Sequence, residues 1–587
     1  MTKCNIYKAL SCAHLPLFPE NAKGYVPRGW AAEQLTALRV AGEAALAAPA
    51  PDTCYSLFRQ HAITGNRVGY QTPYYAKRQR LVLFSLLAWQ EPSNAAYVQA
   101  LEDTIWSVCS EPYWCLPAHF LVEENEPLPL QDYATQIDLF AAETGFALAE
   151  ILQLCAHLLS PVIRQLIEDQ LEARIFAPFC NAARYFRFEC MTNNWSAVCA
   201  GAVGAAAMYC IQDGARLSSI LHRAMSCMQV YLSSFGEDGV CVEGVDYWSY
   251  GFGFFTCFAD LLYKRTNGVI DLFANAKVEA IARSQSLFYI GKGGTISFSD
   301  GGEAGRYRMG LSCYLARRYP GSVIPDIAVA APVLQDTCAR YCLALRDFLW
   351  YDENAVFGLP KDEMRYAQNA KWFILRRKAV CLAAKGGHNG ESHNHNDGGS
   401  FFLAKNGVQL LCDFGAGEYD AKYFSEQRYE VFVNASRSHN VPIINGLLQA
   451  AGADFACANE TASENGFSLD VNGCYACSTL TAFHRAFHVE ADGTVTLADR
   501  FAFSALGDVT EVFATLGTVT LGNGKAVFAR NGEALTLHFD ASALTPSLHS
   551  ETFAGHHGEA LTATLLHLSA KPALQTELRF TMQMAEA

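Results

Sequence analysis

The chain has 587 residues, more than the roughly 250 to 300 at which one hydrophobic core stops growing, so two or more domains are expected. Hydrophobic residues make up 51% and charged residues 17% of it, a balance typical of a globular enzyme and not of a disordered protein. The formal net charge of −14 argues against a surface that gathers polyanions non-specifically, and we expect no nucleic-acid partner.

The N-terminal segment and the cysteines bear on the compartment. MTKCNIYKALSCAHLPLFPE lacks a basic region followed by an apolar one, which predicts a cytoplasmic protein, or a periplasmic or secreted one if a leader has been removed. The 21 cysteines are scattered along the chain, many in apolar company, as expected of buried free thiols in a reducing compartment. The weakly polar run over residues 195–211 is too short for a membrane span, so we expect a closely packed core helix there and no membrane partner.

Helical periodicity dominates up to about residue 370. In SPVIRQLIEDQLEARIF, Ser160 is a candidate N-cap, Pro161 takes the first helical position, and apolar residues recur at steps of three and four. Similar stretches follow one another along the first part of the chain. They predict a helical bundle, solenoid or toroid over residues 1–370.

After about residue 371 the apolar period changes to two. LQTELRFTM, residues 574–582, alternates apolar and polar side chains as a half-buried strand does. Asn406-Gly407 and Asn531-Gly532 stand between strand-like runs and predict tight hairpins. Residues 371–587 therefore read as an antiparallel β-sandwich, and the whole chain as a multidomain α + β protein.

The stretch SHNHNDGGSF, residues 392–401, has the composition of a metal or proton-transfer site. His393 and His395 are two apart and share one face of an extended segment, while Asp413 and His439 follow downstream. Two imidazoles and a carboxylate suit zinc or another transition metal. Because a straight hairpin would keep His395 far from Asp413, we expect the chain to bend at Gly398-Gly399. A polar turn without function is the alternative.

Two asparagines precede the small-residue helix in FECMTNNWSAVCAGAVG. Asn193 and Asn194 are both able to cap it, and capping by itself explains one of them. An amide beside Trp195 would also suit a sugar-binding surface, since indole rings stack on sugars.

A third polar and aromatic cluster lies in GEDGVCVEGVDYWSYGFGFF. Tyr247 and Tyr250 are three apart, which brings them to neighbouring positions on a helix, and Trp248 lies between them. Core packing is the alternative for these aromatic rings. The surrounding acidic residues favour a polar rim over a buried stripe.

Taken together and in this order, NNWSAVCAGAVG, EDGVCVEGVDYWSYG, SHNHNDGGSFFLAKNGVQLLCDFG and SRSHNVPIING resemble the heparinase II/III-type polysaccharide lyases. The resemblance covers residues 190 to 445 in motifs. It implies an N-terminal incomplete (α/α) toroid followed by an antiparallel β-sandwich. It also implies β-elimination on uronic-acid-containing glycans such as heparan, chondroitin or hyaluronan, with an anionic oligo- or polysaccharide as partner.

Carried over by resemblance, Asn194 neutralises the uronate carboxylate and Tyr247 is the acid for the leaving oxygen, with the role of base open to the same phenol. His393 is a base or a carboxylate-binding partner. His395, Asp413 and His439 hold one divalent ion, zinc with manganese as the alternative, mainly in a structural role. The expected substrate-binding residues are Asn193, Trp195, Trp248, Tyr250 and Arg437. Several relatives have a histidine directly after the neutralising asparagine, where this chain has Trp195.

Two other classes of function stay open at this point. One is a glycoside hydrolase on an (α/α) toroid, with Glu237 or Asp238 paired with Asp300 or Glu303 across the bond. The other is a carbohydrate-binding protein without catalysis. The sequence leaves the oligomeric state open.

Overall fold

The computed structural model describes residues 2–19, 22, 24–120, 130–181, 183–358, 361–391, 393–420 and 422–585. The chain divides into two compact units that alternate along the sequence. Unit 1 comprises residues 1–235, 249–282 and 307–356, and unit 2 comprises residues 236–248, 283–306 and 357–587. Two short segments that lie within the predicted helical region therefore belong to unit 2.

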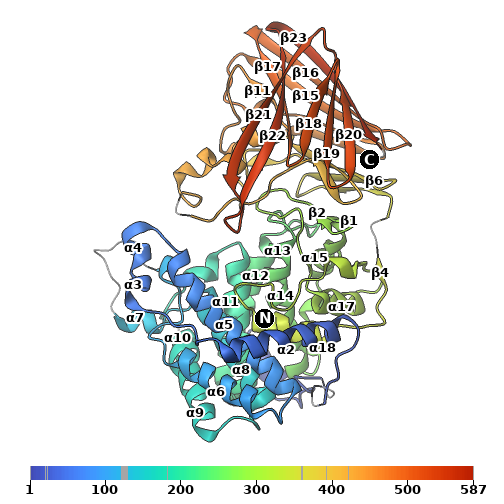
Figure 1. Ribbon diagram of the computed structural model, residues 1–587. Coiled ribbons are helices and arrows are strands. Elements are labelled where there is room, and N and C mark those ends of the chain that lie inside the picture. The colour runs from blue at the N-terminus through green and yellow to red at the C-terminus, as the bar shows by residue number, and fades with distance from the viewer. Residues whose placement is uncertain are drawn as a thin grey trace. The chain divides into compact units, whose positions relative to one another are not determined.

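Unit 1 consists almost entirely of helices (Figure 1). Its helices, with α15 ending at the unit's border, are α1 (Lys3–Leu10), α2 (Trp30–Ala47), α3 (Tyr55–Phe58), α4 (Gln60–Thr64), α5 (Val68–Gln90), α6 (Ala95–Cys109), α7 (Leu130–Ala134), α8 (Leu139–Cys155), α9 (Pro161–Leu171), α10 (Ala177–Cys180), α11 (Asn194–Cys210), α12 (Gly214–Ser233), α14 (Gly253–Arg265), α15 (Ala276–Arg283), α17 (Met309–Arg318) and α18 (Tyr341–Leu349). The short strand β3 (Ile324–Pro325) completes it.

The small-residue helix α11 lies in the core of unit 1, as the sequence predicts. It packs against α8, α12 and α14, and its side chains from Ser196 to Tyr209 are buried. Glycine is required at position 204, because a Cβ there would lie 2.5 Å from Cε2 of Phe258 on α14. The run of small side chains thus lets neighbouring helices approach closely.

Helix α9 shows the same agreement at its start. Ser160 accepts a hydrogen bond from the backbone N–H of Ile163, and Pro161 occupies the first turn. Ile163, Ile167 and Leu171 face the core.

Unit 2 is built from antiparallel sheets (Figure 1). Its short helices are α13 (Val245–Tyr247) and α16 (Gln285–Phe288). Its strands are β1 (Tyr289–Gly291), β2 (Gly294–Thr295), β4 (Phe357–Gly358), β5 (Glu363–Ala367), β6 (Trp372–Arg377), β7 (Val380–Lys385), β8 (His388–Asn389), β9 (Phe401–Lys405), β10 (Val408–Leu411), β11 (Ile443–Ile444), β12 (Gly452–Ala456), β13 (Ala458–Ser463), β14 (Gly466–Asp470), β15 (Leu480–Val489), β16 (Val495–Gly507), β17 (Val509–Thr515), β18 (Thr518–Gly522), β19 (Lys525–Arg530), β20 (Glu533–His538), β21 (Leu544–Ala554), β22 (Ala560–Ala570) and β23 (Ala573–Ala585).

Three sheets carry most of these strands. Their orders are β10-β9-β7-β6-β5, β11-β17-β22-β21 and β13-β14-β15-β16-β23-β20-β19-β18. One apolar core joins side chains of all three sheets, among them Phe373, Leu403, Phe487, Phe513 and Phe580. Layered antiparallel sheets that share one core are the predicted sandwich.

Both predicted Asn-Gly hairpins are present. Asn406 and Gly407 have φ of 51° and 82° and connect β9 to β10, and Asn531 and Gly532, at 48° and 80°, connect β19 to β20. In the first hairpin Val408 pairs with Lys405, as expected, but the register shifts between Gln409 and Leu411. This β-bulge lies two residues before Asp413 and changes the direction of the strand there.

Two further predictions concern helices and thiols. Among the described residues, no helix is long and apolar enough to cross a membrane. All 21 cysteines are free thiols, and many of them are buried.

Candidate active site and metal centre

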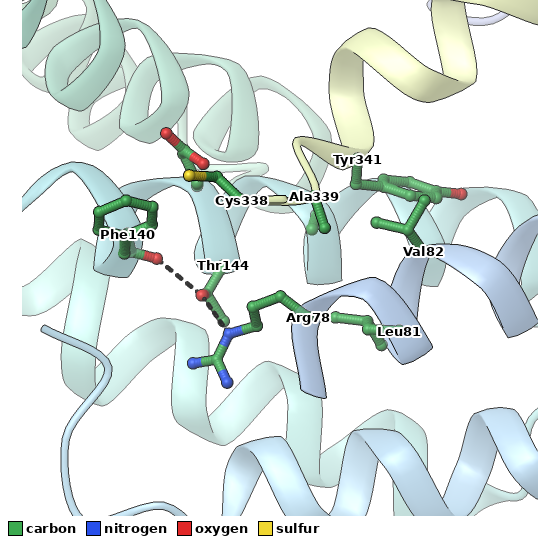
Figure 2. A pocket seen from close by; sticks show the side chains of 10 residues that line it. Arg78, Leu81, Val82, Phe140, Thr144, Cys338, Ala339 and Tyr341 are labelled. Atoms are coloured by element: carbon green, nitrogen blue, oxygen red, sulfur yellow. Dashed lines mark hydrogen bonds between the residues drawn. The ribbon is translucent and has the colours of Figure 1, made fainter. Parts of the chain in front are cut away.

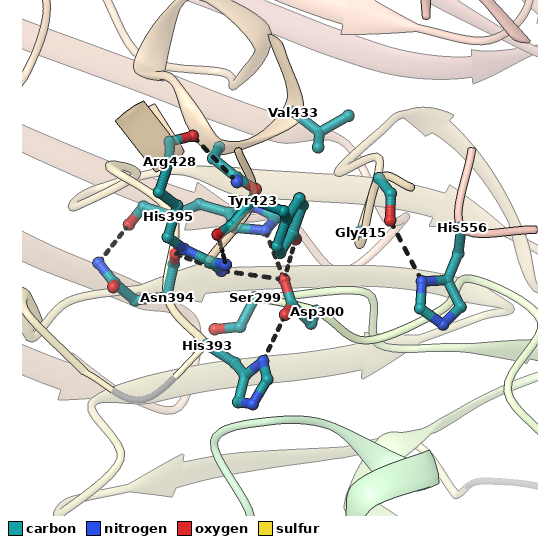
Figure 3. A network of polar contacts seen from close by, with 12 residues as sticks. Ser299, Asp300, His393, Asn394, His395, Gly415, Tyr423, Arg428, Val433 and His556 are labelled. Atoms are coloured by element: carbon teal, nitrogen blue, oxygen red, sulfur yellow. Dashed lines mark hydrogen bonds and ion pairs between the residues drawn. The ribbon is translucent and has the colours of Figure 1, made fainter. Parts of the chain in front are cut away.

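A buried carboxylate, Asp300, lies at the centre of a polar network in unit 2 (Figure 3). It sits in the turn that follows β2, and its side chain is 0% exposed. Five side chains donate to its two oxygens: His393, His395, Tyr419, Tyr423 and Arg428. A carboxylate has about four lone-pair positions, so Asp300 is saturated as an acceptor.

The same contacts hold Asp300 in its ionised form. Burial raises the pKa of this carboxyl, but the hydrogen bonds from His393 and His395 outweigh burial and place the pKa well below its usual range. These donors therefore favour the ionised form of Asp300.

His393 is the partly exposed imidazole of this network. Its Nδ1 lies 2.6 Å from Oδ2 of Asp300, and its ring lies 4.8 Å from the ring of Tyr247 between centroids. Burial lowers its pKa, but the hydrogen bond and charge of Asp300 outweigh burial, so the pKa is raised. Its backbone has φ of 53°, in the left-handed region that non-glycine residues seldom occupy and that recurs at functional sites.

One phenol, that of Tyr419, connects Asp300 to Tyr247. The hydroxyl of Tyr419 donates to Oδ2 of Asp300 at 2.7 Å, and the hydroxyls of Tyr247 and Tyr419 are 2.9 Å apart. Because Tyr419 gives its single proton to the carboxylate, Tyr247 must be the donor in the second bond. Burial and, next, the charge of Asp300 hold the pKa of Tyr247 well above its usual range, so this phenol keeps its proton at neutral pH.

His395, Asp413 and His439 form a second cluster, with one potential ligand atom from each within 4.8 Å of the others. All three side chains are 0% exposed. His395 Nδ1, Asp413 Oδ2 and His439 Nδ1 are buried, and none of them makes a hydrogen bond of good geometry with the described residues, although His439 Nδ1 lies 3.2 Å from Asp413 Oδ2. Buried polar atoms that make no hydrogen bond are rare and energetically costly. A bound cation is one physical explanation for three such atoms that face one another.

The remaining polar atoms of the triad have partners that orient them. His395 Nε2 donates to Asp300 at 3.1 Å, His439 Nε2 donates to the Val433 carbonyl at 2.9 Å, and Asp413 Oδ1 accepts from the Gly415 N–H at 3.1 Å. In its neutral form each histidine therefore directs an unprotonated Nδ1 toward the cluster. The donor set fits a divalent transition-metal ion, and the predicted bend is present, with φ of 79° at Gly399.

In unit 1 the two neighbouring asparagines differ. Asn193 is the N-cap of α11 and its Oδ1 accepts the Trp195 N–H at 3.1 Å. Asn194 is buried and, among the described residues, its side-chain amide makes no hydrogen bond. The amide that capping leaves uncommitted is thus that of Asn194.

Trp195 is partly exposed and packs edge-on against an imidazole that the sequence analysis did not select. The ring centroids of His119 and Trp195 are 4.9 Å apart. His119 Nδ1 donates to the buried carboxylate of Asp138 at 2.7 Å, which leaves Nε2 as the unprotonated nitrogen of the neutral ring. An imidazole thus lies beside Trp195 in unit 1.

The other predicted substrate-binding residues differ in exposure. Trp248 is 0% exposed, so its ring offers no surface to a sugar in this conformation. Tyr250 is buried, its hydroxyl donates to Glu143, and Arg340 lies 3.7 Å from its ring centroid. Arg437 is partly exposed, with its guanidinium beside the ring of Phe432.

A small cavity in unit 1 lies beside Glu143 (Figure 2). Its volume is about 20 Å³, and it is lined by side chains including Arg78, Phe140, Thr144 and Cys338. Arg78 donates to Thr144, which donates in turn to the Phe140 carbonyl. A space of this size holds about one water molecule and no sugar ring.

Three residues of the Asp300 network were missed as site residues or given another role. Tyr419 and Tyr423 lie four apart just after Asp413, and this aromatic spacing near a candidate ligand was the available signal. Asp300, in SFSDGG, was considered only as a hydrolase acid. Its contacts join positions more than ninety residues apart, which no local pattern reveals.

Comparison with known proteins gives one domain match and several structural likenesses. The sequence model of the heparinase II/III-like C-terminal domain matches residues 359–581. A heparan sulfate lyase from Pedobacter heparinus is similar over 100% of this chain and 88% of its own, with 11% identity and a TM-score of 0.60. A heparinase III is similar over 97% of this chain and 94% of its own, with 13% identity and a TM-score of 0.63.

A chondroitin AC lyase from Streptomyces coelicolor A3 is similar over 100% of this chain and 83% of its own, with 11% identity and a TM-score of 0.52. No curated protein matches the chain in sequence. At these identities the likeness concerns the fold, and it confirms the predicted helical toroid followed by an antiparallel sandwich.

Proposed function

We propose that this chain, which carries a heparinase II/III-like C-terminal domain over residues 359–581, is a polysaccharide lyase that cleaves uronic-acid-containing glycans by β-elimination. The observation that supports this most directly is the pairing of Tyr247 and His393 in unit 2. A protonated phenol and a partly exposed imidazole lie with ring centroids 4.8 Å apart and are linked to one buried carboxylate.

The reaction needs an acid, a base and a partner for the uronate carboxylate. The base takes the proton from C5, the electron pair forms the C4–C5 double bond, and the C4–O4 bond breaks as the leaving oxygen takes up a proton. Charge that develops on the carboxylate must be stabilised by donors. The products are an unsaturated uronide and a free hydroxyl.

The structure supports a division of these tasks. Tyr247 is the acid, because its raised pKa keeps the proton that the leaving oxygen needs. His393 donates Nδ1–H to Asp300, so its Nε2 is the nitrogen that takes the C5 proton or, when protonated, binds the carboxylate. By resemblance, the uncommitted amide of Asn194 donates to the carboxylate.

For the triad we propose zinc, held by His395, Asp413 and His439, with manganese as the alternative. Nitrogen and carboxylate donors of this kind suit zinc. When bound, the ion would cross-link three loops of unit 2 and fix the segment that carries His393. No step of the elimination is assigned to it.

As substrates we propose anionic oligo- or polysaccharides. The lyases with similar structures are described as acting on heparan sulfate and chondroitin, so these glycans are the first to test. The net charge of −14 favours short fragments or less charged polymers over long, highly sulfated chains.

The decisive experiment is an activity panel. The purified chain is incubated with heparan sulfate, chondroitin, hyaluronan and alginate, and unsaturated uronides are followed by ultraviolet absorbance. Tyr247→Phe should lower kcat/KM by about 10²- to 10⁴-fold, the usual contribution of a general acid. Asn194→Ala should lower it by about 10²- to 10³-fold.

A matched control is Tyr475→Phe, which also removes a hydroxyl from unit 2. Tyr475 is buried and donates to the Pro442 carbonyl, away from the Asp300 network, so turnover should stay unchanged. Absence of unsaturated product on every glycan would refute the lyase proposal, and products of hydrolytic mass would favour a hydrolase.

The carboxylates considered for a hydrolase already have partners, which weakens that alternative. Asp300 is saturated, Glu303 forms a two-pronged ion pair with Arg530, and Asp238 accepts backbone N–H groups. A binding protein without catalysis would bind oligosaccharide but release no product.

A further inference from the structure

We propose that Asp300 is the positioning residue of this site: its one carboxylate fixes the tautomers of both His393 and His395, and so directs one free imidazole nitrogen to the reaction and another to the metal triad. The half that concerns His393 rests on the proposed function. The half that concerns His395 rests on the buried triad and does not depend on any activity.

The tautomer of His393 follows from the acceptor it faces. Oδ2 of Asp300 receives the hydrogen bond from His393 Nδ1 at 2.6 Å and the hydroxyl of Tyr419 at 2.7 Å. An ionised carboxylate only accepts, so the proton of the neutral imidazole must sit on Nδ1. Nε2 then carries the lone pair, and the side chain is 21% exposed, enough for a substrate to approach it.

The tautomer of His395 follows from the other oxygen of the same carboxylate. Oδ1 of Asp300 receives His395 Nε2 at 3.1 Å, which places the proton on Nε2. Nδ1 is then unprotonated, buried and without a hydrogen bond among the described residues, and it lies in the group formed with Asp413 and His439. A carboxylate behind a metal-ligating histidine sets its orientation and raises its basicity as a ligand.

Two histidines of opposite tautomer, two residues apart, therefore share one acceptor. His393 uses Nδ1 and His395 uses Nε2 toward Asp300, so their free nitrogens differ in type. The left-handed backbone at His393 accompanies this arrangement, in which two side chains of one short segment reach the same carboxylate. Figure 3 shows Asp300 between them.

The turn that carries Asp300 is held in place by close backbone approaches inside unit 2. A Cβ at Gly415 would lie 2.0 Å from the carbonyl oxygen of Gly301, and a Cβ at Gly244 would lie 2.9 Å from the Gly301 Cα. Both glycines have positive φ, 64° and 95°. Arg428 and Tyr423 also donate to Oδ1, so the carboxylate has little freedom to turn away.

The same carboxylate is the last acceptor in the series of hydrogen bonds from Tyr247 to Tyr419 to Asp300. Tyr419 donates to Asp300 and can only accept from Tyr247, so the proton of Tyr247 is held in a defined direction until a substrate oxygen competes for it. Asp300 thus acts on all three parts of the site through other residues and touches no substrate itself.

Asp300→Asn is the sharpest test, because it keeps shape and volume but replaces one acceptor oxygen with an NH₂ donor. An amide cannot accept from both histidines as the carboxylate does, so at least one imidazole must change tautomer or lose its partner. The matched control is Asp470→Asn. Asp470 also accepts from a histidine in unit 2, His484 Nδ1 at 2.8 Å, but belongs to the strand pair β14 and β15.

The first readout is histidine-selective ¹⁵N NMR, with signals assigned through His393→Gln and His395→Gln. At a pH where the rings are neutral, the unsubstituted protein should show His393 protonated on Nδ1 and His395 on Nε2. Asp300→Asn should change at least one of these signals, and Asp470→Asn should change neither. This measurement needs neither activity nor metal, and the unsubstituted protein is informative even if Asp300→Asn does not fold.

The second readout is the affinity for zinc(II), measured by chelator competition. Loss of a carboxylate behind a metal-bound histidine typically weakens binding by about 10- to 100-fold, and this range is expected for Asp300→Asn but not for Asp470→Asn. The third is turnover: kcat should fall at least about 100-fold with a smaller change in KM, because orientation of acid and base matters most in the transition state.

Several results would overturn the inference. One is His393 protonated on Nε2 or His395 on Nδ1 in the unsubstituted protein. Another is a folded Asp300→Asn variant, verified by circular dichroism, whose histidine signals and zinc affinity equal those of the Asp470→Asn control. A chain that lacks lyase activity but shows the expected tautomers would refute the proposed function and the catalytic use of His393, and would leave the role of Asp300 toward His395 and the metal triad in place.

Discussion

Tyr247 and Tyr250 lie three residues apart in the sequence, but their hydroxyls have different partners. Tyr247 donates to Tyr419 in the Asp300 network of unit 2, whereas Tyr250 donates to Glu143 in unit 1. Spacing on a helix predicted only that the two rings would be neighbours. A short π-helical stretch, Trp248–Phe252, begins directly after Tyr247, contains Tyr250 and changes the helical phase.

Glu143, the partner of Tyr250, gives a prediction for stability against pH. Burial raises its pKa to about 7, against the lowering effect of Arg340 and of the Tyr250 hydrogen bond. The folded state therefore binds a proton more tightly than the unfolded state. Protonated Glu143 therefore contributes to the free energy of unfolding, by at most about 3 kcal/mol. This contribution is fully present below about pH 4.5 and is lost as pH rises to about 7.

Glu143→Gln should remove this dependence. The difference in thermal midpoint, variant minus unsubstituted protein, should increase from pH 5 to pH 8 in a series of thermal scans, and the increase reflects the lost proton of the native carboxyl. Glu168→Gln on the exposed face of α9 is the control and should show a constant difference. A constant difference for Glu143→Gln as well would contradict the prediction.

Within a single element, helix α11, the first two asparagines have different roles: one stabilises the helix and the other is a candidate for binding substrate. Asn193 caps the helix through the Trp195 N–H, and Asn194 occupies the first helical position with an uncommitted amide. The sequence predicted that capping needs only one of the two asparagines. Backbone conformation determines that Asn193 is the capping residue. Asn193 is extended, with φ of −148°, so its side chain faces the free N–H groups of the first turn.

Substitution of the two asparagines should therefore affect different quantities, stability for Asn193 and turnover for Asn194. Asn193→Ala should lower the free energy of unfolding by about 1 kcal/mol, while Asn193→Asp should keep most of the stability because aspartate also caps helices. Asn194→Ala should leave stability nearly unchanged and reduce turnover. Denaturant unfolding monitored by circular dichroism checks the first expectation, and a larger loss of stability in Asn194→Ala would reverse the assignment.

At the scale of the whole molecule, the triad joins segments that lie far apart along the chain. His395 lies shortly before the bend at Gly398-Gly399, Asp413 follows β10, and His439 follows a short 3-10 helix at Ser436–Ser438. An ion bound there cross-links these loops in the folded state only. Its stabilisation then follows the free metal concentration, about 2.7 kcal/mol at a hundredfold excess over Kd.

Chelation should accordingly lower the thermal midpoint of the transition that includes unit 2. Zinc added back should restore it, whereas Asp413→Asn should unfold at the same temperature with zinc or with chelator, because one of three ligands is lost. Scanning calorimetry of the full chain provides the measurement. An equal response of Asp413→Asn and the unsubstituted protein would place the metal elsewhere or exclude it.

Local patterns determined much of the fold. The change of apolar period near residue 371 predicted helices followed by strands, and Asn406-Gly407 and Asn531-Gly532 predicted two hairpins. These predictions were possible because each signal depends only on residues that are close together in the sequence. The resemblance in motifs also named His395, Asp413 and His439, which the structure brings together.

Long-range packing determines which segments make up unit 2 and how the Asp300 network comes together. Residues 236–248 and 283–306 belong to unit 2 although helical sequence surrounds them, and these two segments bring Tyr247 and Asp300 to His393 and Tyr419. Which chemical groups the chain possesses, and much of the local structure around them, can be read from the order of its residues. That five side chains donate to one buried carboxylate depends on long-range packing. The segments that carry these side chains are far apart along the chain, and no local pattern in the sequence indicates that they are close in space.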